Sequence, residues 1–204
     1  MKVEVTPYES ISAVPTKEQP DVKNLLVIAS TLVSAAVIVG YMSMVGLYLS
    51  ERADVLANGE TWLPDGVSIP LTQPNYMGLS IAFSLFTVWW TVSAVRNGDR
   101  SNAILAYCST LLFSFGFIAQ TFYLISLLEM PAAESNQAIL IYSLIGVHLL
   151  LTVIGIGHIF VVALRTLVGD FSKENYEAVV SSAIFWTAIV ILYSVLWYAV
   201  YITK

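Results

Sequence analysis

The feature that most constrains this chain is a series of five long apolar segments that contain no Asp, Glu, Lys or Arg. They cover residues 25–50, 76–95, 103–128, 139–164 and 179–202. A bilayer core about 30 Å thick needs about 20 consecutive apolar residues per helix, and each segment supplies enough. Composition agrees, because 57% of the residues are hydrophobic and only 11% are charged. The sequence therefore predicts an all-α, polytopic membrane protein built as a bundle of five transmembrane helices.

The predicted bundle forms one domain, residues 25–204, behind a short arm. The polar stretches between the apolar segments are short, and we find no internal repeat. Residues 1–24 are polar and precede an apolar segment too long for the core of a cleavable signal peptide, which predicts a cytoplasmic N-terminal arm. The single Cys108 leaves no disulfide within the chain. The net charge of −5 is spread over the loops, so we do not expect a nucleic-acid partner.

Lysine and arginine fall unevenly on the two sides of the predicted membrane domain. With five helices the loops alternate sides, and the positive-inside rule places the more basic side in the cytoplasm. The sequence therefore predicts a plasma-membrane protein with a cytoplasmic N-terminus and an external C-terminus. The basic residues of the inner side are Lys2, Lys17, Lys23, Arg96, Arg100, Arg165 and Lys173, and those of the outer side are Arg52 and Lys204.

The ends of the apolar segments carry signals for helix starts and for membrane interfaces. Ser101-Asn102 and Ser135-Asn136 are predicted N-caps of the third and fourth helices, and Pro74 suits the first turn of the second. Aromatic side chains near both ends predict belts at the interfaces. The outer belt would hold Tyr48, Trp62, Tyr123, Trp197 and Tyr201, and the inner belt Trp89, Trp90 and Tyr107.

Small residues on two segments predict close contact between helices. Ala36, Gly40 and Ser43 follow one another at i, i+4 and i+7, which places them on one stripe. Gly146 and Gly157 are eleven residues apart, close to three helical turns. Small side chains let membrane helices approach closely, so these residues are candidates for packing within the bundle or against another subunit.

Polar side chains inside the apolar segments are few. His148 and His158 are separated by about 15 Å of helix and cannot share one metal ion, so each is predicted to be a hydrogen-bonded packing residue. Gln120 lies in the third segment. We predict no catalytic, cofactor or metal site in this chain. A small transporter or channel, with a pore lined by Ser, Thr, Gln120 and the two histidines, is the alternative that the residues leave open.

Several short motifs follow one another in an order that one known family shares. They are residues 47–53 with Trp62-Leu63-Pro64, the turn 94–99, the stretch 116–120 ending in Gln120, Gly146-Val147-His148 with Gly155 and Arg165 downstream, and Phe185-Trp186. Together they resemble subunit III of the haem-copper oxidases, in the five-helix form that lacks the first two helices of the longer version. The resemblance covers nearly everything after the N-terminal arm.

The chain departs from that family at four ionisable positions. Val37 stands where the family carries a buried glutamate, and Leu151 where it has a second histidine in the fourth helix. In the last helix Trp186 is followed by Thr187 rather than histidine, and Val190 replaces an aspartate. These departures indicate a divergent or paralogous member, in which a direct part in proton buffering is in doubt.

The resemblance implies a non-catalytic subunit of a cytochrome c oxidase in the aerobic respiratory chain. Such a subunit packs against the catalytic subunit I and holds phospholipids, while haem and copper lie in the partner subunits. Gln120, His148 and Trp186 would then serve helix packing or the subunit interface. Arg96, Arg100 and Arg165, at inner helix ends, are candidates for binding lipid phosphate, or else are topology signals alone. A subunit III-like chain of a quinol oxidase or nitric oxide reductase is not separated from this interpretation by sequence.

Overall fold

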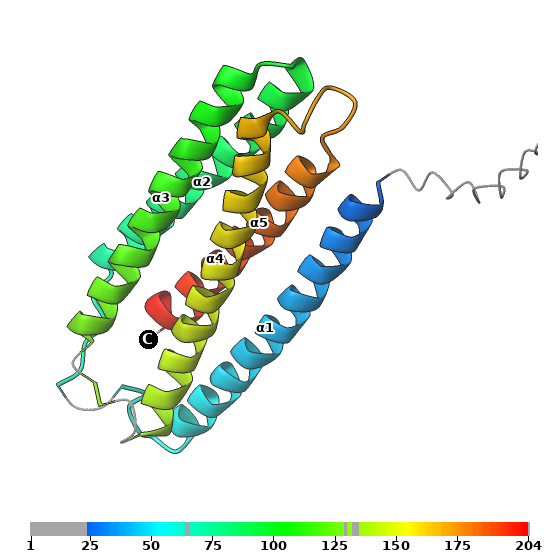
Figure 1. Cartoon of the computed structure of the whole chain (residues 1–204). Helices are drawn as coiled ribbons and strands as arrows, with labels where there is room; N and C mark the ends of the chain where they lie inside the picture. The colour runs from blue at the N-terminus through cyan, green and yellow to red at the C-terminus, as the bar shows by residue number, and fades with distance from the viewer. Residues whose placement is uncertain (1–23, 64–65, 129, 132–134, 204) are drawn as a thin grey trace, which may run out of the picture.

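The computed structural model describes residues 24–63, 66–128, 130–131 and 135–203 (Figure 1). Within these residues the chain is all-helical, and five helices are long and apolar enough to cross a membrane. This confirms the five helices that the apolar segments predict. The predicted arm lies outside the described residues except for Asn24. The helices are α1 Leu25–Ala57, α2 Thr72–Asn97, α3 Arg100–Leu127, α4 Asn136–Val168 and α5 Glu177–Leu196, which continues as the π-helix η1 Trp197–Ile202.

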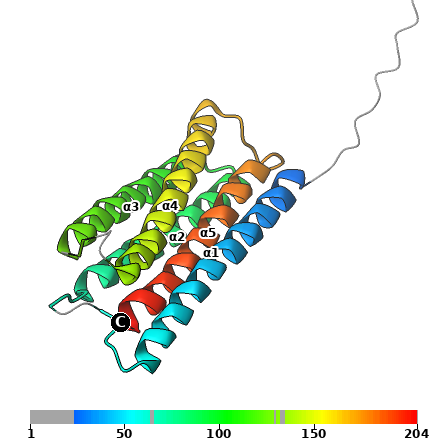
Figure 2. The ribbon, with the colours of Figure 1, turned by 90° about the horizontal axis from the view of Figure 1, so that it is seen from below.

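The last helix is the centre of the bundle. α5 contacts α1, α2 and α4, whereas α3 packs against α2 and α4. In the apolar stretch of α5 and η1, 67% of the residues are buried. In the apolar stretch of α1, which lies at one edge of the bundle, the share is 11%. Figures 1 and 2 agree that α1 and α3 lie on opposite sides of the molecule. The rest of the described chain therefore leaves most of the surface of α1 uncovered.

The turn between α2 and α3 is tighter than the sequence predicts. Gly98 ends α2 in the left-handed conformation, at φ +75°, which costs glycine little. Asp99 then caps α3, because its carboxylate accepts a hydrogen bond of 3.0 Å from the backbone N–H of Asn102. The prediction that Ser101-Asn102 caps this helix is therefore wrong, since both residues already lie in its first turn.

The other two predicted helix starts are confirmed. The Ser135 hydroxyl accepts a hydrogen bond of 3.1 Å from the backbone N–H of Ala138 at the start of α4. Pro74 lies in the first turn of α2, where its missing N–H leaves no hydrogen bond unmade.

The predicted aromatic belts are only partly present. Trp89, Trp90 and Tyr123 are exposed on the helix surface, as a belt requires. The prediction is wrong for four other residues, because the fold turns them inward. Trp62, for example, lies in the loop between α1 and α2 and donates a hydrogen bond of 3.0 Å to the Tyr48 hydroxyl. The four buried aromatic residues are Tyr48, Trp62, Tyr107 and Tyr201.

Candidate functional site

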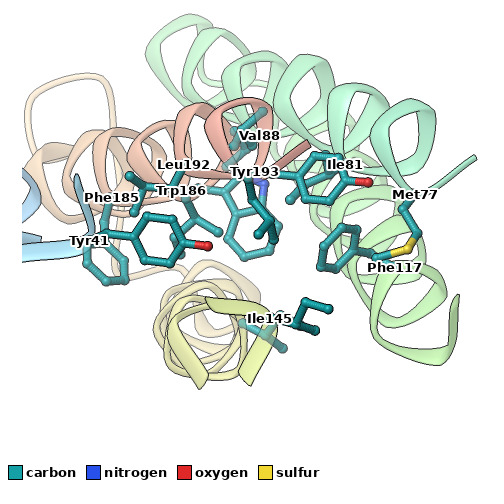
Figure 3. Packing of buried hydrophobic residues seen from close by; sticks show 14 of the residues in the cluster. Tyr41, Met77, Ile81, Val88, Phe117, Ile145, Phe185, Trp186, Leu192 and Tyr193 are labelled. Carbon is teal, nitrogen blue, oxygen red and sulfur yellow. The ribbon is translucent and has the colours of Figure 1, made fainter. Parts of the chain in front are cut away.

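The centre of the bundle is held by neutral hydrogen bonds that join different helices. Trp186 of α5 is fully buried among the hydrophobic residues of the core (Figure 3), and its indole N–H donates to the Ser84 hydroxyl of α2 at 2.9 Å. Ser84 in turn donates to the Ile81 carbonyl at 2.6 Å. Trp186 is therefore a packing residue with a satisfied N–H, which agrees with one of the two roles that the sequence allows it.

His148 lies in the same layer and is buried at 2% exposure. Its Nε2 is 3.1 Å from the Ile189 carbonyl of α5, so the ring donates its N–H to that oxygen. Tyr41, Phe117 and Tyr193 surround the imidazole, with ring centroids between 5.6 and 6.2 Å away. This confirms the prediction of a hydrogen-bonded packing histidine at this position.

Two tyrosine hydroxyls and one amide also form hydrogen bonds between helices. Tyr41 of α1 donates to the Leu144 carbonyl of α4 at 3.0 Å, and Tyr193 of α5 donates to the Pro74 carbonyl of α2 at 2.5 Å. Gln120 of α3 donates to the Ser80 hydroxyl of α2 at 3.0 Å. Each bond ties a helix to a neighbour without any charged group.

The residues at the four positions that depart from the oxidase family take part in the packing and hydrogen bonding between helices. Val37 and Leu151 are partly buried against the hydrophobic core, and Val190 belongs to it. Thr187 donates to the Ala183 carbonyl and accepts a hydrogen bond of 3.0 Å from the indole of Trp89. Among the described residues, the buried polar side chains are all Ser, Thr or His.

The small residues chosen from the sequence do not make close contacts within the chain. Ala36, Gly40 and Ser43 are exposed on α1. A methyl group added at Gly40, Gly146 or Gly157 would meet nothing within 4 Å, so packing inside the bundle is the wrong interpretation for these three glycines. Contact with another subunit, the second role considered for this set, stays a prediction.

The glycine that does allow close packing is Gly155. A Cβ built there would lie 2.5 Å from Cδ1 of Ile189 and 3.0 Å from the Trp186 ring. The α4 backbone therefore passes directly over the α5 side chains at this point. Sequence reasoning missed this role because Gly155 and Gly157 are near neighbours, and only their opposite orientations distinguish them.

The three arginines that the sequence predicts on the inner side have different partners. Arg165 forms an ion pair of 3.1 Å with Asp170, and Arg100 donates to the Leu167 carbonyl near the end of α4. Arg96 stacks over the Tyr176 ring at 5.6 Å and has no carboxylate partner among the described residues. It also helps to line an open cavity of about 360 Å³, together with Trp89, Val92, Ser93 and Asn97. Arg96 is therefore the inner arginine best placed to meet an external anion.

The remaining polar residues do not converge on one site. His158 is half-buried beside Phe185 and lines a groove between α1, α4 and α5. It makes no hydrogen bond with the described residues, so the prediction of a hydrogen-bonded packing histidine is wrong at this position. None of the cavities described within residues 24–203 is lined by more than one of Gln120, His148 and His158. In the part of the chain that the structure describes, no group of three or more His, Cys, Asp or Glu side chains could hold a metal ion.

Comparison with known proteins adds no relative. No family model matches the sequence, and a search of the curated proteins finds no match. The resemblance to oxidase subunit III therefore remains a prediction from the motifs of this chain.

Proposed function

We propose that this protein is a non-catalytic, subunit III-like membrane subunit of a haem-copper terminal oxidase. The observation that carries the proposal is the chemistry of the interior. No charged side chain is buried among the described residues, and the inward tryptophan, histidine and tyrosines are used to join helices. Side chains that move protons or ions through membranes are usually ionisable, and such a core offers few of them. A supporting role in a larger assembly suits such a bundle.

The surface supports the same proposal. Few residues in the apolar stretch of α1 are buried against the rest of the chain. The small residues Ala36, Gly40 and Ser43 of this helix are exposed. Small exposed residues allow the backbone of a partner helix to approach closely, which gives membrane helices their main packing energy. The stripe Ala36, Gly40 and Ser43 is therefore the proposed contact with the catalytic subunit. The partners are this subunit, other oxidase subunits and phospholipids, and haem and copper belong to those partners.

The proposal is tested by isolating the chain with its neighbours. An affinity-tagged version would be purified from native membranes in mild detergent, and the eluate examined by visible spectroscopy and copper analysis. We expect co-purification with a polypeptide that carries haem and copper. Untagged membranes taken through the same column are the control.

The other outcomes identify the alternatives. A copper-free eluate with haem would favour a nitric oxide reductase, and oxidation of quinol rather than cytochrome c by the eluate would favour a quinol oxidase. Recovery of the chain without haem-bearing partners, together with solute flux in vesicles that contain this chain alone, would replace the proposal with a transporter.

A further inference from the structure

A groove opens between α1, α4 and α5 in the half of the bundle that holds the N-terminus of α1. In Figure 1 the ribbons of α1 and α4 run close together at their other ends and separate toward this one, with α5 behind them. The groove between them has a volume of about 410 Å³, within the range of small-molecule sites. Its walls are Leu26, Ala29, Ser30, Val33, Ile154, His158, Ser181 and Phe185.

The groove contains an imidazole that the protein leaves without a hydrogen bond. His158 has no hydrogen-bond partner among the described residues, and its ring lies beside that of Phe185, with 6.3 Å between the ring centroids. The Ser30 and Ser181 side chains line the same groove and are nearly buried. An imidazole in an apolar setting is costly without a partner, so a molecule that supplies an oxygen atom would be stabilised here.

The dimensions of the groove favour a ring over a lipid chain. Its lining covers five residues of α4, Ile154 to His158, and five of α5, Ser181 to Phe185, which is about 6 Å on each helix. On α1 the lining extends from Leu26 to Val33, about 10 Å. An acyl chain crosses its whole leaflet, about 15 Å of the bilayer core. The groove is shorter than that, and one of its walls is the aromatic ring of Phe185.

The lack of charged side chains in the groove argues against an ionic lipid headgroup as its ligand. Among the described residues, no Asp, Glu, Lys or Arg lines the groove, and Arg96, Arg100 and Arg165 are not part of its lining. A phosphate group would therefore lose its hydration without gaining a countercharge. A neutral ring that carries carbonyl or hydroxyl oxygens would lose little and would gain the His158 hydrogen bond.

We propose that this groove binds the ring of a membrane-dissolved quinone or quinol. The His158 ring donates its N–H to a quinone carbonyl, or accepts from a quinol hydroxyl through its other nitrogen. The Phe185 side chain packs against the ligand ring, and the isoprenoid tail leaves through the open side into lipid. The site belongs to this chain alone, so it goes beyond the proposed oxidase role and does not depend on it.

The test uses the purified full chain in phosphatidylcholine nanodiscs free of quinone. A photoreactive azidoquinone would be added, the sample illuminated, and the labelled peptides identified by mass spectrometry, with decylubiquinone as competitor. We expect label on the groove residues of α1, α4 and α5, and its loss on competition. In His158→Phe the ring volume is kept and the hydrogen bond removed, so binding should weaken on the order of tenfold.

Matched substitutions separate the groove from general partition into lipid. Ala29→Leu fills this groove, whereas Ala35→Leu adds the same side chain to a neighbouring groove between α1 and α5. Specific labelling should be lost in Ala29→Leu and unchanged in Ala35→Leu. Both alanines are exposed, so both variants should fold, which gel filtration and circular dichroism would verify.

Two results would overturn the proposal. One is label that decylubiquinone does not displace or that is equal in the two leucine variants. The other is a phospholipid that native mass spectrometry finds on the wild-type chain but not on Ala29→Leu, and that decylubiquinone does not displace. That second result would make a phospholipid the occupant.

Discussion

At the scale of single residues, Gly155 and Trp186 determine how closely the two central helices approach. A Cβ on Gly155 would lie 2.5 Å from Cδ1 of Ile189 and 3.0 Å from the Trp186 ring, whose indole N–H donates to Ser84 on α2. One glycine thus sets the distance between α4 and α5, and the tryptophan links α5 to α2. The free energy of this contact comes from dense packing, because lipid tails offer helices no hydrophobic driving force to associate.

A pair of glycine variants tests this role. Gly155→Ala should destabilise the bundle by about 1–3 kcal/mol through overpacking, because the Ile189 methyl group at 2.5 Å and the rigid Trp186 ring at 3.0 Å would both have to shift. Gly146→Ala, on the same helix, meets open space and should change the stability little. Thermal unfolding in detergent, followed by circular dichroism, measures the difference. Equal transition temperatures for the two variants would contradict the packing described for Gly155.

At the scale of helices, the ends of α2 and α3 are defined by adjacent residues. Gly98 is the C-cap of α2 and Asp99 is the N-cap of α3, so no residue lies between the two caps. Hydrogen bonds from the backbone N–H and then the side chain of Asn102 hold the pKa of the Asp99 carboxyl below its ordinary value of 3.8. The ionised carboxylate also interacts favourably with the N-terminal dipole of α3.

This cap should give the start of α3 a pH dependence on the acid side. Because folding lowers the pKa of Asp99, its contribution is fully present above the ordinary value of 3.8 and is lost as the pH falls through the lower folded value. Hydrogen exchange of the first-turn amides of α3 should therefore accelerate in acid, beyond the intrinsic effect of pH. In Asp99→Asn, whose side chain cannot ionise, this acceleration should vanish. An identical acid profile in both proteins would rule out the carboxylate as its origin.

At the scale of the whole molecule, the fold sorts residues of one type into different roles. The three inner arginines lie at the same end of the bundle, but Asp170 neutralises Arg165 and a helix carbonyl occupies Arg100. Arg96 alone of the three faces an open cavity without an acceptor among the described residues. The predicted lipid site therefore narrows from three candidates to one.

The amount of anionic lipid that stays bound to the purified chain tests whether Arg96, rather than Arg165, binds lipid phosphate. Arg96→Gln should lower the phosphatidylglycerol retained by the purified chain by roughly fivefold, since one basic residue near a membrane surface contributes about 1 kcal/mol. The double variant Arg165→Gln/Asp170→Asn removes an ion pair without changing the net charge, and it should retain wild-type amounts. A larger loss in the double variant than in Arg96→Gln would move the lipid site to the α4 end.

Assembly with a partner is the second prediction at this scale. Gly146→Leu should leave the fold of the chain intact, because its side chain would point away from the bundle. It should nevertheless reduce co-purification with the proposed catalytic subunit, at a cost on the order of a few kcal/mol, if this face meets another helix closely. The yield of the complex per tagged chain gives the answer. Normal assembly would show that the α4 face around Gly146 is lipid-facing.

The sequence by itself determined the number and placement of the helices, because a helix that crosses a membrane needs a long apolar run and such runs are unambiguous. It also identified His148 as a hydrogen-bonded packing residue, but the same argument was wrong for His158, which faces a groove instead. The aromatic belts show its limit: Tyr48 and Tyr123 have the same kind of position in sequence, yet one is buried and the other exposed.

Only the tertiary structure decided which face of each helix is inside. Apolar residues surround every helix here, so hydrophobic periodicity, the usual signal of an inward face, is nearly absent. Gly155 and Gly157 therefore look alike in sequence, as do Arg96 and Arg165. Their roles separate only when α5 lies against α4 and when Asp170 folds back onto Arg165. The groove at His158 likewise exists only because α1 and α4 diverge over α5.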